Sequence, residues 1–282
     1  MKVAITKNLI YKGSNSRSSL LDVYIPEKDG HIPLLIFIHG FKGFKDWGAW
    51  SVILEQLAQA GFAVVSFNMT HNGGTIKNPI DFPDLDAFAE NTYSKELVDL
   101  DAVINWIIDK KQTYFQKVNL DDIRLIGHSR GGGIALIYAA KHEIIKQVIT
   151  WAAVDSFENR LPNKKQLALW KKNRVDYIEN KRTKQQMPMN YSFVEDLLAN
   201  KEYLSIEKAV CQLKIPQLII HGTIDDAVKP EAARQLKKWN PNAELVFIQD
   251  ANHVFNCSHP FDHKQLSVEA EKLIQETILF LV

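Results

Sequence analysis

The sequence predicts an α/β protein with a mainly parallel central sheet covered by helices on both faces. Short apolar runs alternate along the chain with segments whose apolar residues recur at helical spacing. Several runs, such as PLLIFIHG at 33–40, are apolar almost throughout, which is typical of strands buried on both faces of a parallel sheet. The first 25 residues instead contain two strand-like runs around a turn, and they predict an antiparallel edge.

Eight strands are expected, and each has an apolar or β-branched run bounded by polar or turn residues. The first two are separated by the turn residues at 13–16, whereas the later ones alternate with helical segments. The strands are predicted at 3–9, 20–25, 33–40, 62–68, 123–126, 147–154, 216–222 and 244–250.

Five helices are expected where apolar residues recur every three or four positions. The first, around 50–57, ends at Gly61, a residue type that commonly terminates helices. The second, at 93–107, has an apolar face from Tyr93 to Ile107. The remaining helices are predicted beyond Gly133, around 231–238 and at 267–279.

Residues 155–213 interrupt this alternation. They contain helical and polar segments without a strand signal, and they are too many for a simple connection between a strand and a helix. We therefore predict an inserted helical cap at 155–213 and a core domain that combines residues 1–154 with residues 214–282.

The charges are nearly balanced, with 34 basic and 33 acidic residues and a formal net charge of +1. Nucleic-acid binding usually needs a strongly basic domain or stripe, so no nucleic-acid partner is expected. No stretch approaches the roughly 20 apolar residues that span a bilayer, and the N-terminus lacks the apolar run and cleavage site of a signal peptide. We therefore expect a cytoplasmic protein that does not bind membranes.

The cysteines and histidines suggest neither a disulfide framework nor a metal centre. Cys211 and Cys257 are too few for a framework, and we expect two free, buried thiols in preference to one disulfide. The histidines that could bind a metal are His39, His221, His259 and His263. Their spacing does not indicate a zinc site, and no metal or cofactor is expected.

A single serine lies at a glycine-rich junction between a predicted strand and a predicted helix. Residues 127–131 read GHSRG and match the pattern G-x-S-x-G. On such a sharp turn Ser129 adopts a strained backbone, and glycines flank it because a Cβ there would collide with the adjacent strand or helix. A plain glycine-rich turn would give the same five residues, so the pattern needs further support.

That support comes from an acid and a base later in the chain. A serine hydroxyl is a weak nucleophile and needs a base, which is itself oriented by a third group. Asp225 follows the strand at 216–222, and His253 follows the strand at 244–250. Loops after the carboxyl ends of parallel strands gather at one edge of the sheet. We therefore expect Ser129, Asp225 and His253 to meet there.

With these motifs the sequence resembles the α/β-hydrolase family, and within it the small esterases and prolyl-oligopeptidase-like hydrolases. The resemblance rests on HGFKGFKDW at 39–47, GHSRGG at 127–132, HGTIDDAV at 221–228 and DANH at 250–253, with the order Ser, Asp, His. It covers the chain from about Leu20 onward, except the cap. In the pattern HG-x-x-D-x-x-V the acid is Asp225 rather than the adjacent Asp226, which we expect to cap a turn or face solvent.

The resemblance also implies an oxyanion hole, the pair of backbone amides that binds the negatively charged oxygen of the tetrahedral intermediate. These amides would be those of Phe41 and Arg130. Arg130 stands where Gln, Met or Leu is frequent in the family. Its side chain either favours a substrate with a carboxylate or phosphate, or pairs with an acid of the fold. In the dienelactone-hydrolase branch of the family the nucleophile is a cysteine. Because this chain has a serine at that position, the resemblance does not imply the lactone hydrolysis of that branch.

Two further pairs of residues lie near the predicted site. Lys42 and Lys45 are expected to be solvated charges. His71 and Asn72, after the fourth strand, lie at the same edge of the sheet, and there we expect solvated loop residues rather than substrate contacts.

The cap carries a surplus of positive charge. Between 157 and 202 the chain has ten basic and six acidic residues. Most of these charges should be solvated, although the surplus favours anionic substrates at the entrance of the site. The apolar residues of the cap form its own core or, alternatively, line an acyl pocket; they are Trp170, Tyr177, Met187, Met189, Tyr191 and Phe193.

Together these features predict a serine hydrolase of the carboxylesterase type that acts on a small-molecule ester. The alternative enzyme is a peptidase or amidase of the prolyl-oligopeptidase type, which uses the same three residues. A non-catalytic binding protein on the same fold is a third hypothesis, and it would be expected to have lost part of the Ser-His-Asp set.

Overall fold

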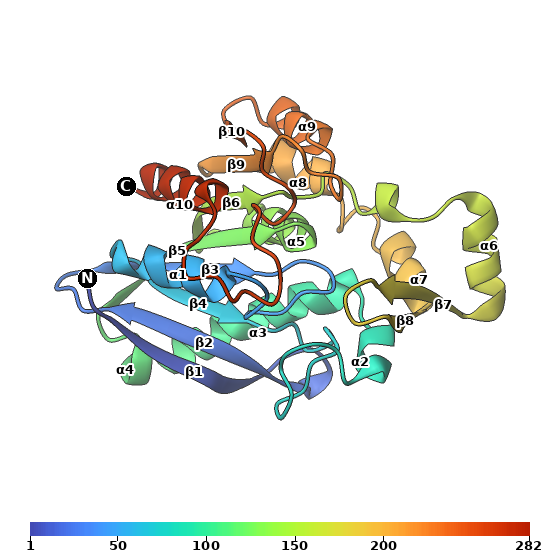
Figure 1. Ribbon diagram of the computed structural model, residues 1–282, viewed down its shortest axis with the longest axis horizontal. Coiled ribbons are helices and arrows are strands. Elements are labelled where there is room, and N and C mark those ends of the chain that lie inside the picture. Colours follow the sequence, from blue (N-terminus) through green and yellow to red (C-terminus); the bar gives the residue numbers. More distant parts are fainter.

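The structure is a computed structural model that describes residues 1–282. Its centre is an eight-stranded sheet in the order β1-β2-β4-β3-β5-β6-β9-β10, and β7 and β8 form a separate hairpin (Figure 1). The strands are β1 (Val3–Lys12), β2 (Ser18–Pro26), β3 (Ile32–Ile38), β4 (Ala63–Phe67), β5 (Val118–His128), β6 (Ile145–Trp151), β7 (Val175–Asn180), β8 (Gln185–Asn190), β9 (Gln217–Gly222) and β10 (Glu244–Ile248).

Six strands of the sheet, β4, β3, β5, β6, β9 and β10, are parallel, whereas β1 and β2 form the antiparallel edge. The helices are α1 (Trp50–Gln59), α2 (Leu85–Ala89), α3 (Tyr93–Asp109), α4 (Lys111–Tyr114), α5 (Arg130–Ala139), α6 (Lys164–Asn173), α7 (Ser192–Ala199), α8 (Ile206–Gln212), α9 (Glu231–Trp239) and α10 (Val268–Leu281), with short 3-10 helices η1 (Ser14–Ser16) and η2 (Glu158–Arg160). The predicted eight-stranded, mainly parallel sheet flanked by helices is confirmed.

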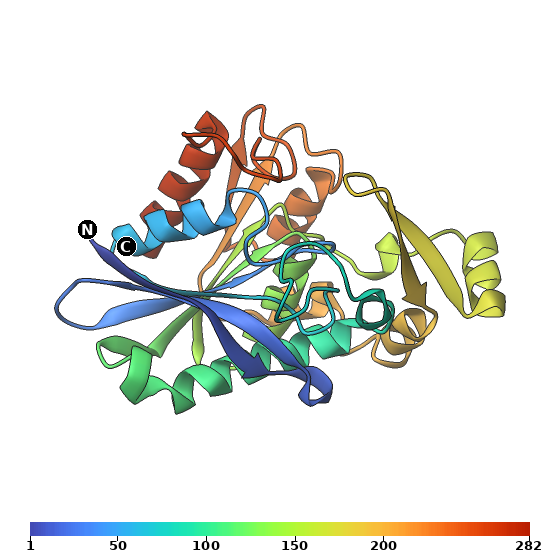
Figure 2. The ribbon, with the colours of Figure 1, turned by 60° about the horizontal axis from the view of Figure 1, so that its bottom comes forward.

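The sheet is buried on both faces, which explains why its central strands are apolar at nearly every position. Alternate residues of β3 belong to two different cores: Leu34 and Ile36 face α3 and α5, whereas Leu35 and Phe37 face α1 and α10. Figure 2 shows α1 and α10 on one side of the sheet and α3 on the other. No helix of the structure is long and apolar enough to cross a membrane.

Helix α5 begins earlier than the sequence predicted. Its first residue is Arg130, so the glycines at 131–133 belong to the helix rather than to the turn before it. They are needed for close packing: a Cβ on Gly131 would lie 2.3 Å from the Ile38 carbonyl oxygen, and one on Gly132 would lie 2.4 Å from Ala153 Cβ. Gly131 and Gly132 therefore let α5 lie against β3 and the end of β6, whereas Gly133 makes room for Phe157 and Ile206.

The segment at 155–213 contains η2, α6, α7 and α8, but it also contains the antiparallel hairpin β7–β8. The expectation of helices alone was therefore wrong in this respect. The hairpin escapes sequence analysis because its strands are largely polar and half-exposed, so they show no apolar alternation. The hairpin, α6 and α7 lie at the end of the molecule opposite both termini (Figure 1).

The two cysteines are free, as expected, but only Cys257 is buried, whereas Cys211 is exposed.

Lys45 is fully buried, which contradicts the expectation of a solvated charge. Its Nζ atom lies 2.7 Å from a carboxylate oxygen of Asp22 on β2 and 2.5 Å from one of Asp46. Its backbone N–H donates to the side chain of Asn68 at 2.6 Å. Because a buried ammonium is costly unless it is paired, these bonds hold the loop at 40–48 against β2 and the end of β4.

Replacement of Lys45 by Met should reduce the free energy of unfolding by about 3–5 kcal/mol, because it leaves the buried Asp22 carboxylate without its cation. Denaturant titration measures this change. Lys7→Met is the control, because Lys7 is half-exposed and its Nζ lies 3.9 Å from Asp46 Oδ1. This substitution should reduce the free energy of unfolding by less than about 1 kcal/mol. Equal effects of the two substitutions would contradict a structural role for the Lys45 ion pair.

Candidate active site

Ser129 lies on a sharp turn between β5 and α5. Its φ of 56° and ψ of −118° place it in a region that non-glycine residues rarely adopt. A hydrogen bond from its N–H to the Trp151 carbonyl, at 2.9 Å, fixes this backbone. The preceding glycine is required, because a Cβ on Gly127 would lie 2.3 Å from the Gly131 carbonyl oxygen. This is the strand-turn-helix context that the G-x-S-x-G pattern requires.

The structure brings together the three side chains that the sequence predicted. His253 Nε2 lies 3.0 Å from Ser129 Oγ, and His253 Nδ1 lies 2.7 Å from Asp225 Oδ2. The loops that carry Asp225 and His253 follow the parallel strands β9 and β10, and Ser129 follows β5. The imidazole can therefore accept a proton from the serine while it donates its other N–H to the carboxylate.

Asp225 is held as a carboxylate by hydrogen bonds. Burial opposes its ionisation, but bonds from His221 and His253 outweigh the burial and keep the pKa of Asp225 well below its usual range. Its other oxygen, Oδ1, accepts the backbone N–H groups of Ala227 and Val228, both at 2.9 Å. The neighbouring Asp226 is almost fully exposed and pairs with Lys229 at 2.6 Å.

His128, the residue before the serine, is a part of the site that sequence analysis missed. It is buried, and its Nε2 lies 2.8 Å from the His253 carbonyl oxygen. Burial, aided by the nearby His253, lowers the pKa of His128 to about 3, so its ring is neutral and can donate this bond. The loop of His253 is thereby tied to the turn that carries Ser129. Only the position of His128 within GHSRG could have suggested this contact.

Two backbone amides next to the serine lack hydrogen-bond partners. The Phe41 N–H, in the loop after β3, makes no hydrogen bond. Arg130 is the first residue of α5, and such an N–H has no acceptor within its own helix. Gly40 lies against the serine, since a Cβ on it would be 2.9 Å from Ser129 Cβ. The two amides can therefore donate to an oxyanion near Ser129 Oγ.

His39 holds the loop that carries the Phe41 amide. Its Nε2 accepts the N–H of Met69 at 3.1 Å, so its Nδ1 carries the proton and donates to the Gly40 carbonyl at 2.9 Å. Burial lowers the pKa of His39 to about 4, which keeps the ring in this neutral form.

The Arg130 side chain pairs with an acid of the fold, which was one of the two alternatives left open by the sequence. Its Nη1 lies 3.3 Å from Glu96 Oε1. Its guanidinium carbon lies 3.9 Å from the centre of the Phe41 ring, a cation–π distance. Burial raises the pKa of Glu96, although Arg130 and a hydrogen bond from Asn91 oppose this shift. The Arg130 charge is thus largely neutralised within the protein.

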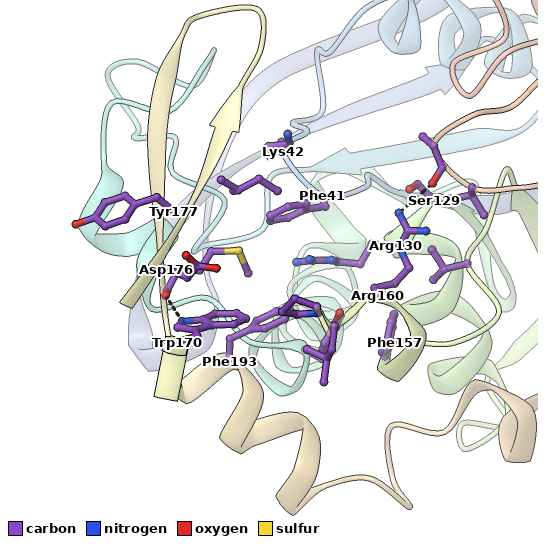
Figure 3. Close-up of a pocket in the computed structure, with 18 of the residues that line it drawn as sticks. Phe41, Lys42, Ser129, Arg130, Phe157, Arg160, Trp170, Asp176, Tyr177 and Phe193 are labelled. Carbon is purple, nitrogen blue, oxygen red and sulfur yellow. Dashed lines mark hydrogen bonds between the residues drawn. The ribbon is translucent and has the colours of Figure 1, made fainter. Parts of the chain in front are cut away.

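A cavity of about 540 Å³ opens beside Ser129 and His253 (Figure 3). Most of the residues that line it are hydrophobic. Residues 155–213, which lie between β6 and β9 and are called the insertion below, supply about half of its wall. The residues concerned are Phe157, Arg160, Leu161, Pro162, Trp170, Asp176, Tyr177, Ile178, Met189 and Phe193. Figure 3 shows Ser129 at one end of the cavity and the hairpin residues Asp176 and Tyr177 at the other.

The apolar residues of the insertion divide between the two roles that the sequence left open. Trp170, Tyr177, Met189 and Phe193 line the cavity. Met187 instead packs with Phe44, Phe82 and Phe88, and so joins the hairpin to α2 and to the loops of Phe44 and Phe82.

His71 and Asn72 are buried, so the expectation of solvated loop residues was wrong, and neither lines the cavity. The side-chain amide of Asn72 donates to the Gly43 carbonyl at 3.2 Å, and His71 Nδ1 lies 2.8 Å from the Thr70 hydroxyl. Both residues support loops beside the site.

The histidines that the sequence singled out bind protein groups. His221 Nε2 lies 2.8 Å from the Val228 carbonyl oxygen. His259 Nδ1 accepts the Gly48 N–H at 2.9 Å. His259 and His263 are four residues apart, but they lie in a loop, so this spacing does not place them on one helix face. No group of three or more His, Cys, Asp or Glu side chains is arranged to hold a metal ion.

Comparison with known proteins identifies the family. A family model described as an alpha/beta hydrolase fold matches residues 33–187 and 150–260, which together make up most of the chain. The protein therefore belongs to the α/β-hydrolase family, in agreement with the resemblance seen in its motifs.

Individual relatives are distant. The chain is 25% identical to Lipase 1 from Psychrobacter immobilis, over 78% of this chain and 71% of that protein. It is also 25% identical to the AB hydrolase superfamily protein YisY from Bacillus subtilis (strain 168), over 80% and 87% of the two chains. Among solved structures, Est1E from Butyrivibrio proteoclasticus with bound ferulic acid has a TM-score of 0.72 at 23% identity and covers 97% and 98% of the two chains. The last similarity shows a shared fold.

Replacement of Arg130 by Met tests its pairing with Glu96. The variant should lose about 3–5 kcal/mol of the free energy of unfolding at pH 7.5, because a buried carboxylate loses its cation. The loss should be smaller at pH 5, where Glu96, whose pKa is raised, can be neutralised by a proton.

The double variant Arg130→Met/Glu96→Gln should recover most of this stability, since no unpaired charge remains. Denaturant titrations of the two variants and the wild type at both pH values measure these differences. If the single substitution leaves stability unchanged at pH 7.5, Arg130 does not neutralise Glu96.

Proposed function

We propose that the protein hydrolyses carboxylic esters of small molecules through an acyl-enzyme intermediate on Ser129. The observation that carries this proposal is the unbroken series of hydrogen bonds from Asp225 through His253 to Ser129 at one end of an apolar cavity. Membership of the α/β-hydrolase family and the similarity to Lipase 1 support it.

In the first half of the reaction, His253 Nε2 takes the proton of Ser129 while Ser129 Oγ attacks the ester carbonyl carbon. Asp225 keeps the imidazole in the tautomer that accepts this proton, and it stabilises the imidazolium that forms. The Phe41 and Arg130 amides donate to the resulting oxyanion. His253 then gives its proton to the leaving alcohol, which departs as the C–O bond breaks.

In the second half, a water molecule takes the place of the alcohol. His253 removes a proton from this water, which attacks the acyl carbon, and the acid product leaves as Ser129 regains its proton. The same residues could cleave an amide, whose leaving group is poorer. We favour the ester because an alcohol is the better leaving group and because the chain is 25% identical to Lipase 1. A non-catalytic binding protein would not need the complete set of three side chains.

Replacement of Ser129 by Ala should reduce kcat for p-nitrophenyl esters by at least about 10⁴-fold, because no other group can form the acyl-enzyme. The measurement uses acyl chains of graded length, with aminoacyl anilides assayed in parallel. A fluorophosphonate probe should label the wild-type protein at Ser129 alone.

Full esterase activity in the Ser129→Ala variant would exclude this mechanism. Hydrolysis of the anilides at rates above those of the esters would favour the peptidase alternative, and binding without turnover of either class would favour a binding protein.

Asp225→Asn should lower kcat by about 10⁴-fold, because the amide lets the imidazole adopt the wrong tautomer. Asp226→Asn is the matched control. Its side chain points into solvent, and its loss should cost roughly tenfold or less. Steady-state kinetics of both variants on one ester measure the difference. A larger loss in the Asp226 variant would mean that the acid had been assigned to the wrong residue.

A further inference from the structure

Three basic side chains line the cavity, and only one of them is paired with an acid. Arg130 is neutralised by Glu96. Lys42 and Arg160 form no ion pair, and each donates only to a backbone carbonyl: Lys42 to that of Glu179 at 3.3 Å, and Arg160 to that of Ala227 at 2.9 Å. A cation that lacks a counter-ion in a partly enclosed site favours an anionic ligand.

Only one of these two cations lies next to the proposed catalytic groups. Lys42 follows Phe41 in the sequence, but its Nζ donates to Glu179 on β7, the strand that also carries Asp176. Arg160 contacts Ala227, two residues after Asp225, so it connects the insertion to the loop of the acid. Arg160 therefore belongs to the end of the cavity where the ester would react.

The other basic residues of the insertion do not line the cavity, and several of them are paired with acids. Arg174 pairs with Glu195, Arg182 with Asp81 and Lys201 with Glu158. The positive surplus that the sequence showed between 157 and 202 thus includes charges that are compensated at the surface, whereas Arg160 faces the cavity without an acid.

The one carboxylate that lines the cavity, Asp176, restricts where an anion can lie. It is on β7, at the end of the cavity away from Ser129 (Figure 3). A negatively charged group of the substrate would be repelled there and attracted at the Arg160 end. The charged group should therefore be only a few bonds from the ester carbonyl.

We propose that the preferred substrates are short esters that carry a carboxylate close to the ester bond, and that Arg160 binds this carboxylate. This inference rests on the proposed function, since it specifies the esters that Ser129 would cleave. The planar guanidinium of Arg160 can donate two parallel hydrogen bonds to a carboxylate. The apolar wall, which includes Phe157 and Phe193, would receive the remainder of the substrate.

The test compares esters of similar size that differ in charge. Methyl hydrogen succinate against methyl butyrate places the carboxylate on the acyl side, and acetoxyacetate against propyl acetate places it on the alcohol side. Hydrolysis is followed by titration of the released acid. In at least one pair, kcat/KM for the anionic ester should exceed that for the neutral one by about 10- to 100-fold, the factor expected for a hydrogen bond between charged groups.

Arg160→Gln should reduce this ratio by about tenfold or more, and Lys42→Gln should reduce it less. Lys164→Gln is the matched control, because it removes a positive charge from the insertion outside the cavity, and the ratio should stay at the wild-type value. An increase in salt from 0.05 to 0.5 M should slow hydrolysis of the anionic esters only, since salt screens the attraction.

Equal rates for the anionic and neutral members of both pairs, or an unchanged ratio in Arg160→Gln, would overturn this inference. The failure of the proposed function would look different: all four esters would then be inert, or Ser129→Ala would hydrolyse them as the wild type does.

Discussion

The close contact of α5 with the sheet is the constraint on which the site depends. Gly127, Gly131 and Gly132 bring the first turn of the helix so near to β3, β5 and β6 that any Cβ at these positions would overlap neighbouring atoms. The chain can enter the helix at this distance only through the positive φ of Ser129. The same close packing therefore positions both the Ser129 hydroxyl and the free Arg130 amide. Both lie at the edge of the sheet where the parallel strands end.

Around this turn, buried histidines hold the loops that carry the other groups. His39 fixes the loop of the Phe41 amide, His128 binds the loop of His253, and His221 binds the loop of Asp225. A neutral imidazole suits this task because it can donate or accept a hydrogen bond without bringing a charge into the core. Burial lowers the pKa of His39 and of His128 far below neutrality, which preserves that state.

The charges near the serine have two different roles. Arg130 lies under the Phe41 ring with its charge matched by Glu96, so it stabilises the positions of the two proposed oxyanion donors. Lys42 and Arg160 line the same cavity without an acidic partner. The insertion provides Arg160 and much of the apolar wall, so the segment with the weakest sequence signal would set the choice of substrate.

The sequence by itself determined the mainly parallel sheet and five of its ten helices, because apolar periodicity is a local property. It also indicated Ser129, Asp225 and His253 through their places after predicted strands. It did not reveal that Lys45 is buried, that β7 and β8 form a hairpin, or that Arg130 pairs with Glu96. Those features depend on partners that are distant in the sequence, such as Asp22 for Lys45. Only the tertiary structure brings such partners together. A charge that becomes buried then needs a partner of opposite sign, because an unpaired charge is costly in the core, whereas a charge at a cavity wall can remain unpaired.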